Sequence, residues 1–204
     1  FLDITASIEN RETILSIVEK VSKNVFIPLT VGGGIKVIED IKKLLNSGAD
    51  KVSINTSGIL NRNFINEASN YFGSQAIVGA IDAKKNGNSW EIYSHGGRKP
   101  TGLDALQWAK TLEKLGAGEL LVTSIDQDGK TSGYDIDLLQ EITNNVNIPI
   151  IASGGAGELK HLSDVLQYSN ADAVLAASIF HYKTYTINQV KDYLSTLNIP
   201  IRPN

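Results

Sequence analysis

The sequence predicts an α/β protein: a (βα)8 TIM barrel of two fused half-barrels, here lacking the first βα unit. Short apolar runs alternate with stretches of helical period along the 204 residues, and no linker or low-complexity tract separates them. Buried strands that alternate with helices are typical of a parallel sheet covered by helices. In addition, the phrase GGGIKVIEDI at 32–41 has an echo, SGGAGELKHL, at 153–162. We therefore expect a single domain over residues 1–204 with an internal repeat.

Seven strands rich in Val, Ile and Ala are expected, each followed by an amphipathic helix. The strands are predicted near residues 1–4, 26–31, 51–55, 77–82, 119–125, 149–153 and 173–178. The helices are predicted near residues 9–23, 36–46, 61–72, 103–115, 135–144, 158–169 and 187–195. Seven βα units are one fewer than a closed barrel of this type contains.

The repeat indicates where the eighth unit belongs. IPLTVGGG at 27–34 matches IPIIASGG at 148–155. On the same offset, the counterpart of IVGAID at 77–82 would lie about 40 residues before Phe1, and two full copies would give roughly 250 residues, the usual size of such a barrel. We therefore expect the first βα unit and the start of the second strand to be missing. The expected halves are roughly residues 1–76 and 77–204.

The composition narrows the classes of function. The chain is 42% hydrophobic and 20% charged with a net charge of −3, which is typical of a soluble globular domain. No basic stretch favours nucleic acid or an anionic membrane, and no apolar run is long enough to span a bilayer. Cysteine is absent, which excludes thiol chemistry in these residues, and His95, His161 and His181 are too scattered to indicate a metal site. We expect no metal, no cofactor and a cytoplasmic location.

Glycines at the ends of two predicted strands suggest phosphate binding. Gly34 closes the triplet after the strand near 26–31, and Gly155 closes the corresponding turn in the second copy. Glycine lets backbone N–H groups approach an anion closely, and the last loops of such barrels commonly hold phosphate. One strand further on, the copies place Asn55 and Thr56 in the first half and Ala177 and Ser178 in the second. Two such sites on one face suit a substrate with a phosphate at each end. The alternative is that the glycines only form tight βα turns.

Carboxylates follow the same strand ends. Asp82 ends the strand near 77–82, at the face where barrel enzymes perform their chemistry, and a carboxyl group there suits general acid or base work. The alternative for Asp82 is a helix N-cap or a salt bridge to Lys84. Other carboxylates at this face are Asp3, Asp126 and Asp128, whereas Asp135 is expected to be the N-cap of the next helix.

The segment 84–102 and the charged residues Lys51 and Glu119 each allow both a functional and a structural interpretation. Asn86-Gly87 predicts a small hairpin within 84–102, which could be a mobile edge over the site or a decorative loop. Lys51 and Glu119 each precede an apolar strand, at the face opposite the catalytic one. They could form an interior salt bridge, or they could belong to a charged ring that gates a passage through the barrel.

Taken together, these residues resemble one family, the cyclase subunit of imidazole glycerol phosphate synthase. The motifs that carry the resemblance span the chain: FLDITAS, VGGGI, GADKVSINT, VGAIDAK, HGGRKPTG, GAGELLVTSIDQDG, SGYD, IASGGAG and ADAVLAASIF. This family has a (βα)8 barrel with fused-half symmetry and acts in histidine biosynthesis, so the resemblance implies a cyclase and lyase.

The resemblance also implies a reaction and a partner. The family takes ammonia from a partner glutaminase, with which it forms a heterodimer, and a bisphosphorylated formimino-aminoimidazole-carboxamide ribonucleotide. It closes the imidazole ring to imidazole glycerol phosphate and releases aminoimidazole carboxamide ribonucleotide. Asp82 matches one catalytic aspartate, expected as the general acid.

Other residues match family positions by the same resemblance. Asp128, Thr123 and Ser153 match positions near the substrate. The phosphate contacts match Gly34, Asn55, Thr56, Gly155, Ala177 and Ser178. Lys51 and Glu119 match members of the charged ring through which ammonia enters, and Asp50 matches a glutaminase-docking position.

One departure from the family pattern leaves alternatives open. The other catalytic aspartate of the family lies on the first strand, which these residues lack, so we expect the intact protein to be an enzyme and the 204 residues alone to be inactive. The alternatives are the sister isomerase of the same pathway, a paralogue that aminates a sugar substrate for surface glycans, and an inactive scaffold that docks a glutaminase. SIDQDGKTSGYD and HGGRKPTG favour the cyclase over the isomerase.

Overall fold

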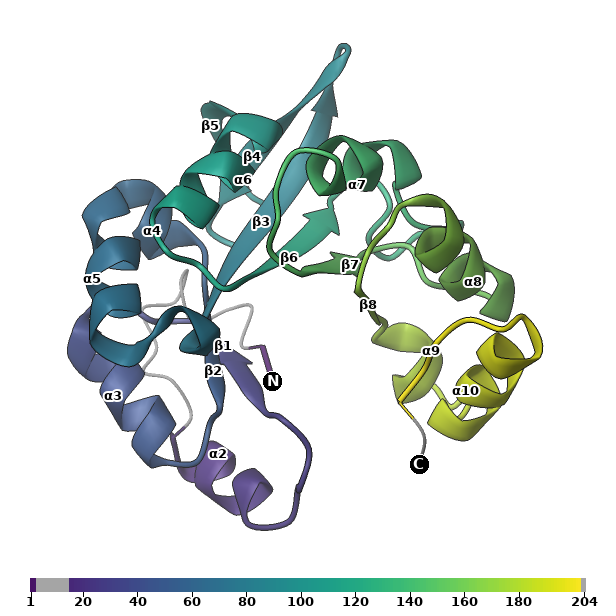
Figure 1. The fold of residues 1–204 in the computed structure, drawn as a ribbon, viewed down its shortest axis with the longest axis horizontal. Helices are drawn as coiled ribbons and strands as arrows, with labels where there is room; N and C mark the ends of the chain where they lie inside the picture. Colours follow the sequence, from purple (N-terminus) through teal and green to yellow (C-terminus); the bar gives the residue numbers. More distant parts are fainter. Residues whose placement is uncertain (3–14, 203–204) are drawn as a thin grey trace.

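Parallel strands and helices alternate along the protein, as a computed structural model shows for residues 1–2 and 15–202 (Figure 1). The strands are β1 (Thr30–Gly32), β2 (Lys51–Ile54), β3 (Ile77–Asn86), β4 (Ser89–Ser94), β5 (Lys99–Asp104), β6 (Glu119–Ser124), β7 (Ile150–Ser153) and β8 (Ala173–Leu175). The helices are α2 (Leu15–Ser22), α3 (Ile38–Asn46), α4 (Thr56–Leu60), α5 (Arg62–Phe72), α6 (Ala105–Lys114), α7 (Ile136–Thr143), α8 (Leu159–Tyr168), α9 (Ser178–His181) and α10 (Ile187–Thr196), with a 3₁₀ turn η1 (Ser74–Ala76).

The strands form one curled sheet with the order β1-β2-β3-β6-β7-β8, and all of these neighbours are parallel. Figure 1 shows the sheet as an open arc with the helices on its outer side. Leu2 extends the first edge by a parallel bridge to Gly32, and within the described residues β8 pairs only with β7. The fold is therefore a partial TIM barrel, which confirms the predicted fold class.

The core explains why these segments form these elements. The strands contribute fully buried Ile54, Ile81 and Leu120, while helices α3 and α7 contribute Ile41 and Ile142. The longer helices bury an apolar stripe, as in α3, where Ile41 and Leu44 are buried and the lysines between them are exposed. Burial of apolar surface is the main force that holds the helices on the sheet, and it stabilises the fold by about 25 cal/mol for each Å² removed from water.

The turn from a helix into the next strand is built in the same way at three places within residues 15–202. A hydroxyl near the end of one helix donates a hydrogen bond to the carbonyl that closes the following helix. These bonds join Ser22 to Ser47, Ser69 to Leu115 and Thr143 to Ser169, at 3.0, 2.9 and 2.7 Å. The next residues, Gly48, Gly116 and Asn170, all have positive φ. At both glycines a Cβ would lie 2.4 Å from the hydroxyl oxygen, so the close approach of the helices requires glycine there.

The same turns then anchor the start of the preceding strand. The bonds run from Asp50 N to Leu29 O, from Gly118 N to Ile77 O and from Asp172 N to Ile150 O. In two of the three turns the aspartate side chain also accepts a hydrogen bond from the strand. Asp50 accepts from Leu29 N at 2.7 Å, and Asp172 accepts from Ile150 N at 2.9 Å. Neighbouring βα units are thus joined by a repeated set of polar contacts.

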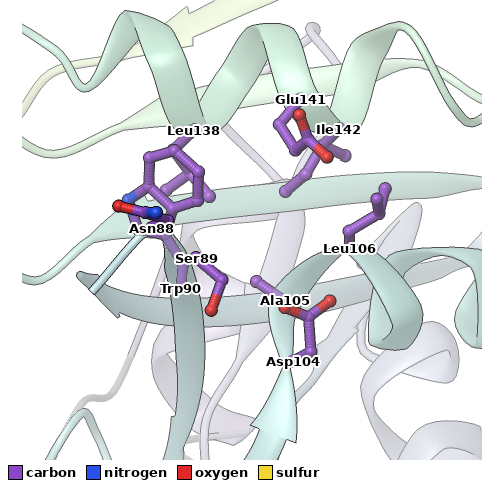
Figure 2. A pocket seen from close by; sticks show the side chains of 9 residues that line it. All are labelled: Asn88, Ser89, Trp90, Asp104, Ala105, Leu106, Leu138, Glu141 and Ile142. Atoms are coloured by element: carbon purple, nitrogen blue, oxygen red, sulfur yellow. The ribbon is translucent and has the colours of Figure 1, made fainter. Parts of the chain in front are cut away.

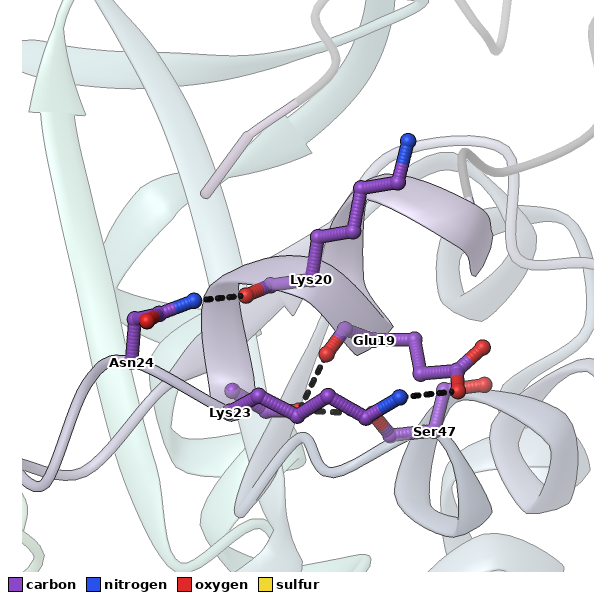
Figure 3. Close-up of polar contacts among 6 residues, drawn as sticks. Glu19, Lys20, Lys23, Asn24 and Ser47 are labelled. Atoms are coloured by element: carbon purple, nitrogen blue, oxygen red, sulfur yellow. Dashed lines mark hydrogen bonds and ion pairs between the residues drawn. The ribbon is translucent and has the colours of Figure 1, made fainter.

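Contacts at the end of α2 recur at the end of α7. Figure 3 shows the Asn24 side chain donating to the Lys20 carbonyl at 2.9 Å, and Asn145 donates to Glu141 at the same distance. Figure 3 also shows the ion pair of Lys23 with Glu19, which is largely exposed and therefore stabilises the helix little.

Several boundaries differ from the sequence predictions. The strand predicted near 26–31 starts later in the structure, where β1 begins only at Thr30. Pro28 has no N–H for a ladder bond, and Phe26 and Ile27 are exposed. The short helices α4 and α9 were not predicted, and most of the strand near 1–4, with Asp3, lies outside the described residues. The remaining predicted strands and helices are confirmed within a few residues, except that only part of helix 9–23 is described.

The segment 84–102 forms a β-hairpin, as Asn86-Gly87 predicted. β3 continues to Asn86, the chain turns through Gly87 with φ +60, and β4 pairs back antiparallel to β3. None of the helices in the described part of the chain is long and apolar enough to cross a membrane.

Candidate active site

Polar side chains gather at the carboxyl ends of the parallel strands. Asp82 of β3 is in register with Thr123 of β6, and Thr123 is in register with Ser153 of β7. Because side chains in register on adjacent strands point to the same face of a sheet, these three predicted residues line one surface. This end of the strands is the catalytic face in barrel enzymes.

Asp82 is the most perturbed carboxylate of the site. Its Oδ2 accepts a hydrogen bond of 2.9 Å from Nδ2 of Asn55. Burial and then the negative charge of Asp128 raise the pKa of Asp82 to about 6, against the lowering effect of the Asn55 bond. A carboxyl group with this pKa can hold a proton near neutral pH and release it in a reaction, as a general acid must.

The sequence prediction for Asp82 needs one correction. Asp82 does not end its strand, because the hairpin lets β3 run four residues further, to Asn86. The parallel pairing with β6 does stop at Ala83, so Asp82 still lies at the end of the barrel part of β3. The alternatives for Asp82 are wrong: it caps no helix, and no ion pair with Lys84 occurs among the described residues. The Lys84 ammonium instead lies 5.9 Å from the centre of the Tyr93 ring.

The short helix α4 begins next to Asp82. Asn55 is its N-cap, and the Oδ1 atom of Asn55 is buried with no hydrogen-bond partner in the described residues. The Thr56 hydroxyl accepts a 2.9 Å bond from the backbone N–H of His95 in the hairpin. Helix α9 starts in the same way after β8, with Ala177 as N-cap and Ser178 as first residue. Sequence patterns could not reveal helices this short, although the polar residues after each strand marked their positions.

Both glycine turns, one in each half of the chain, contain two consecutive residues with positive φ. Gly33 and Gly34 have φ of +103 and +68, and Gly154 and Gly155 have φ of +90 and +110. A Cβ on Gly155 would lie 2.0 Å from the carbonyl oxygen of Gly133, which also packs against this turn through a bond from Gly133 N to Gly155 O. Close packing therefore explains Gly155 by itself, and phosphate contact there stays a prediction.

The loop between β6 and α7 supports this surface. Asp128 is exposed on it, with its backbone N–H bonded to Ser124 O at 2.9 Å. The buried Tyr134 hydroxyl donates to the carbonyl of Leu175 at the end of β8, and burial raises its pKa. Asp135 is the N-cap of α7, as predicted, and accepts from Leu138 N.

Lys51 and Glu119 lie at the opposite end of the strands and form an ion pair. Nζ of Lys51 is 3.0 Å from Oε2 of Glu119, although β3 runs between their strands. The side chains are 30% and 17% exposed, so the pair is largely shielded from water. The predicted interior salt bridge is confirmed, and a gating role is untested. Asp50, next to Lys51, bonds to the backbone of Leu29, so it has a structural role besides any docking role.

A cavity of about 100 Å³ lies elsewhere, between the hairpin and helices α6 and α7. Figure 2 shows Glu141 and Ile142 of α7 across from Asp104 and Ala105. None of the predicted site residues lines it, so we locate the site at the strand ends, where polar groups converge on Asp82. No cluster of metal-ligating side chains occurs among residues 1–2 and 15–202.

A partial TIM barrel with polar side chains at the carboxyl ends of its strands defines an α/β protein of the architecture in which barrel enzymes carry their active sites. Comparison with known protein families matches residues 1–186 to the family described as histidine biosynthesis protein. The chain therefore belongs to the histidine biosynthesis protein family, whose members are typically enzymes, namely isomerases and cyclases of that pathway.

Proposed function

We propose that the protein is the cyclase subunit of imidazole glycerol phosphate synthase. It takes ammonia from a glutaminase and converts the bisphosphorylated formimino-aminoimidazole-carboxamide ribonucleotide to imidazole glycerol phosphate and aminoimidazole carboxamide ribonucleotide. The observation that carries the proposal is Asp82, a carboxylate with a pKa of about 6 held by Asn55 on a polar surface at the strand ends. Asp82 acts as the general acid that protonates a leaving nitrogen during ring closure and cleavage.

The two glycine turns support a substrate with a phosphate at each end. Each turn has two consecutive residues with positive φ at a strand end, a backbone conformation that suits anion binding through N–H groups. One phosphate binds near Gly34, Asn55 and Thr56, and the other binds near Gly155, Ala177 and Ser178. Thr123 and Ser153, in register with each other and beside Asp82, contact the substrate between them, together with Asp128.

The partner binds at the opposite face. Asp50 and the ion pair of Lys51 with Glu119 lie there, and this proposal gives the pair the role of admitting ammonia to the barrel. The glutaminase docks over these residues to form a heterodimer, and the complex works in the cytoplasm.

The experiment is an assay of the full-length protein with ammonium salt and the bisphosphorylated ribonucleotide, with imidazole glycerol phosphate as the measured product. Replacement Asp82→Asn should lower kcat by about 10²- to 10⁴-fold, the usual contribution of a general acid. The control Asp137→Asn removes the same charge from an exposed position in the first turn of α7 and should leave kcat unchanged.

Other outcomes assign other functions. Isomerisation of the precursor without ammonia would identify the sister isomerase of the pathway. Ammonia-dependent amination of a sugar substrate would identify the glycan paralogue. A folded full-length protein that binds glutaminase but turns over none of these substrates would be an inactive scaffold.

A further inference from the structure

The loop 125–134, between β6 and α7, is closed at its base by one carboxylate. Oδ2 of Asp135 accepts hydrogen bonds from the Ser124 hydroxyl at 3.1 Å and from the Trp90 indole N–H at 3.0 Å. Oδ1 accepts from Leu138 N at 3.1 Å and so caps α7. Asp135 thus joins β6, the hairpin strand β4 and helix α7.

The bonds of Asp135 are formed where water has little access. Trp90 is 7% exposed and Ser124 is 2% exposed, so both donors would be costly to leave without an acceptor. The three donors are neutral and share this single carboxylate as acceptor. Bonds from neutral donors to a charged acceptor are stronger than those between neutral groups, which makes Asp135 a firm anchor.

The anchor reaches Asp82 through Ser124 and Asp128. The carbonyl of Ser124 accepts from Asp128 N at 2.9 Å, and Ser124 pairs with Ala83, the residue that follows Asp82. A second tie to β3 runs from Lys85 N to the carboxylate of Asp126 at 2.7 Å. Ser124 and Asp135 flank the loop 125–134 and are hydrogen-bonded to each other. The position of Asp128 relative to Asp82 is therefore set at the base of this loop.

We propose that Asp135 is a positioning residue that fixes Asp128 relative to Asp82 by binding Ser124 and Trp90 at once. The hairpin thereby becomes part of the acid–base site, although it supplies no reacting group. The role in catalysis rests on the proposed cyclase function, but the positioning of Asp128 does not.

The groups around Asp82 make this positioning measurable. β2 leads into the neutral Asn55, β4 contributes Tyr93 as the cross-strand partner, and the loop contributes the charge of Asp128, which raises the pKa of Asp82. If Asp128 moves away, the pKa of Asp82 should fall toward its ordinary value.

The test is the replacement Asp135→Asn in the full-length protein. Asparagine can still cap α7 through Oδ1, but its NH2 group would face the indole N–H of Trp90, so that bond is lost. We expect the Asp82 carboxyl to titrate at a lower pH, followed by NMR with [13C]aspartate and assigned with Asp82→Asn. We also expect kcat to fall about tenfold with little change in KM, a smaller loss than the roughly 100-fold that a misplacement of about 1 Å can cause.

Matched variants separate positioning from loss of a helix cap. Trp90→Phe removes the indole donor, keeps an aromatic ring beside the Lys85 ammonium, and should shift the Asp82 titration in the same direction. In the single variant Asp135→Asn, the asparagine NH2 group and the Trp90 N–H are two donors that face each other. The double variant Trp90→Phe with Asp135→Asn removes one of these donors and should recover part of the change in kcat and in the Asp82 titration. Asp104→Asn changes the N-cap of α6, which accepts from Gln107 N, and should leave the titration unchanged.

The outcomes separate the two proposals. An unchanged titration of Asp82 in folded Trp90→Phe and Asp135→Asn proteins would overturn the positioning role. A shifted titration in a protein without cyclase activity would support the positioning role and reject the proposed function. If Asp135→Asn does not fold, the titration of Trp90→Phe decides.

Discussion

The amide nitrogen of Asn55 lies 2.9 Å from the carboxylate of Asp82 and donates a hydrogen bond to it. This bond favours the charged carboxylate, whereas burial and Asp128 favour the neutral form, and the pKa of about 6 shows that burial prevails. Asn55 therefore only limits the rise in the pKa of Asp82, which is caused by burial and by Asp128. The protein keeps a carboxyl group that is partly protonated near neutral pH at some cost to its stability.

That cost predicts a stabilising mutation. Because the pKa of Asp82 is about 6 in the folded protein and its ordinary value is 3.8, the folded state binds this proton more tightly than the unfolded chain does. Stability should therefore fall as pH rises from about 4 to 6. Asp82→Asn should raise the free energy of unfolding at pH 7 by about 1–3 kcal/mol, since one pKa unit corresponds to about 1.4 kcal/mol.

Urea denaturation of both proteins at pH 7 and pH 3 measures this difference. The gain should be absent at pH 3, where the carboxyl group is protonated in both the folded and unfolded states. An equal gain at the two pH values would show that removal of the charge is not its cause.

Gly155→Ala should destabilise the protein by more than about 2 kcal/mol. Its Cβ would lie 2.0 Å from the carbonyl oxygen of Gly133, and the residue has φ +110, so both contact and backbone strain oppose the substitution. Gly129→Ala is the control in the neighbouring loop, with φ +75 and no atom within 4 Å of the added carbon, and should cost about 1 kcal/mol. Thermal unfolding of both variants measures the contrast, and equal losses would reject the packing explanation.

His161 should act as an acceptor at the start of α8. Its Nδ1 accepts from the backbone N–H groups of Gly157 and Glu158, at 3.2 and 3.1 Å. The corresponding position of α3 is Asp40, whose carboxylate accepts from Lys36 N and Val37 N. His161→Leu should therefore lower the free energy of unfolding by about 1–2 kcal/mol, and His161→Asp by less. If both variants lose the same stability in chemical denaturation, the hydrogen bonds do not matter.

Lys51 and Glu119 should be coupled in stability. Replacing either partner leaves a largely shielded charge without its counter-ion, so Lys51→Met and Glu119→Gln should each cost about 1–2 kcal/mol. The double variant should cost less than the sum, with a coupling energy of about 1 kcal/mol in a double-mutant cycle at low salt. Additive losses would show that the pair contributes nothing. The proposed gating role predicts in addition that the variants change ammonia-dependent turnover more than substrate binding.

The alternation of apolar runs and helical periods was enough to predict the partial barrel. The strands are apolar because the helices cover the sheet that they form, and the longer helices turn one apolar face toward that sheet. Short or irregular elements could not be predicted in this way. β1 is displaced by Pro28, and α4 and α9 are too short to show a period. The division into two related halves stays a prediction, although the contacts of Ser22 and Asn24 recur at Thr143 and Asn145.

The sequence predicted which residues belong to the candidate site, but it did not predict the contacts between them. The sequence indicated Asp82 and Asn55 separately, since each follows an apolar run, but it did not reveal their hydrogen bond. It also missed the ties of the hairpin to Thr56 and Asp135, because these join segments about 40 residues apart through side chains whose partners have no sequence pattern.

The repeated turn between βα units has a consequence for how proteins of this fold can be recombined. Since Ser22, Ser69 and Thr143 each bond the carbonyl that closes the helix of the next unit, the natural module is a pair of βα units together with the turn that ends it. A chimera that joins two relatives just after such a turn, at Asp50 or Asp172, keeps every one of these bonds within a single parent. A join inside the preceding helix would mix donors and acceptors from different parents. Crossover points for shuffled libraries should therefore be placed at these residues.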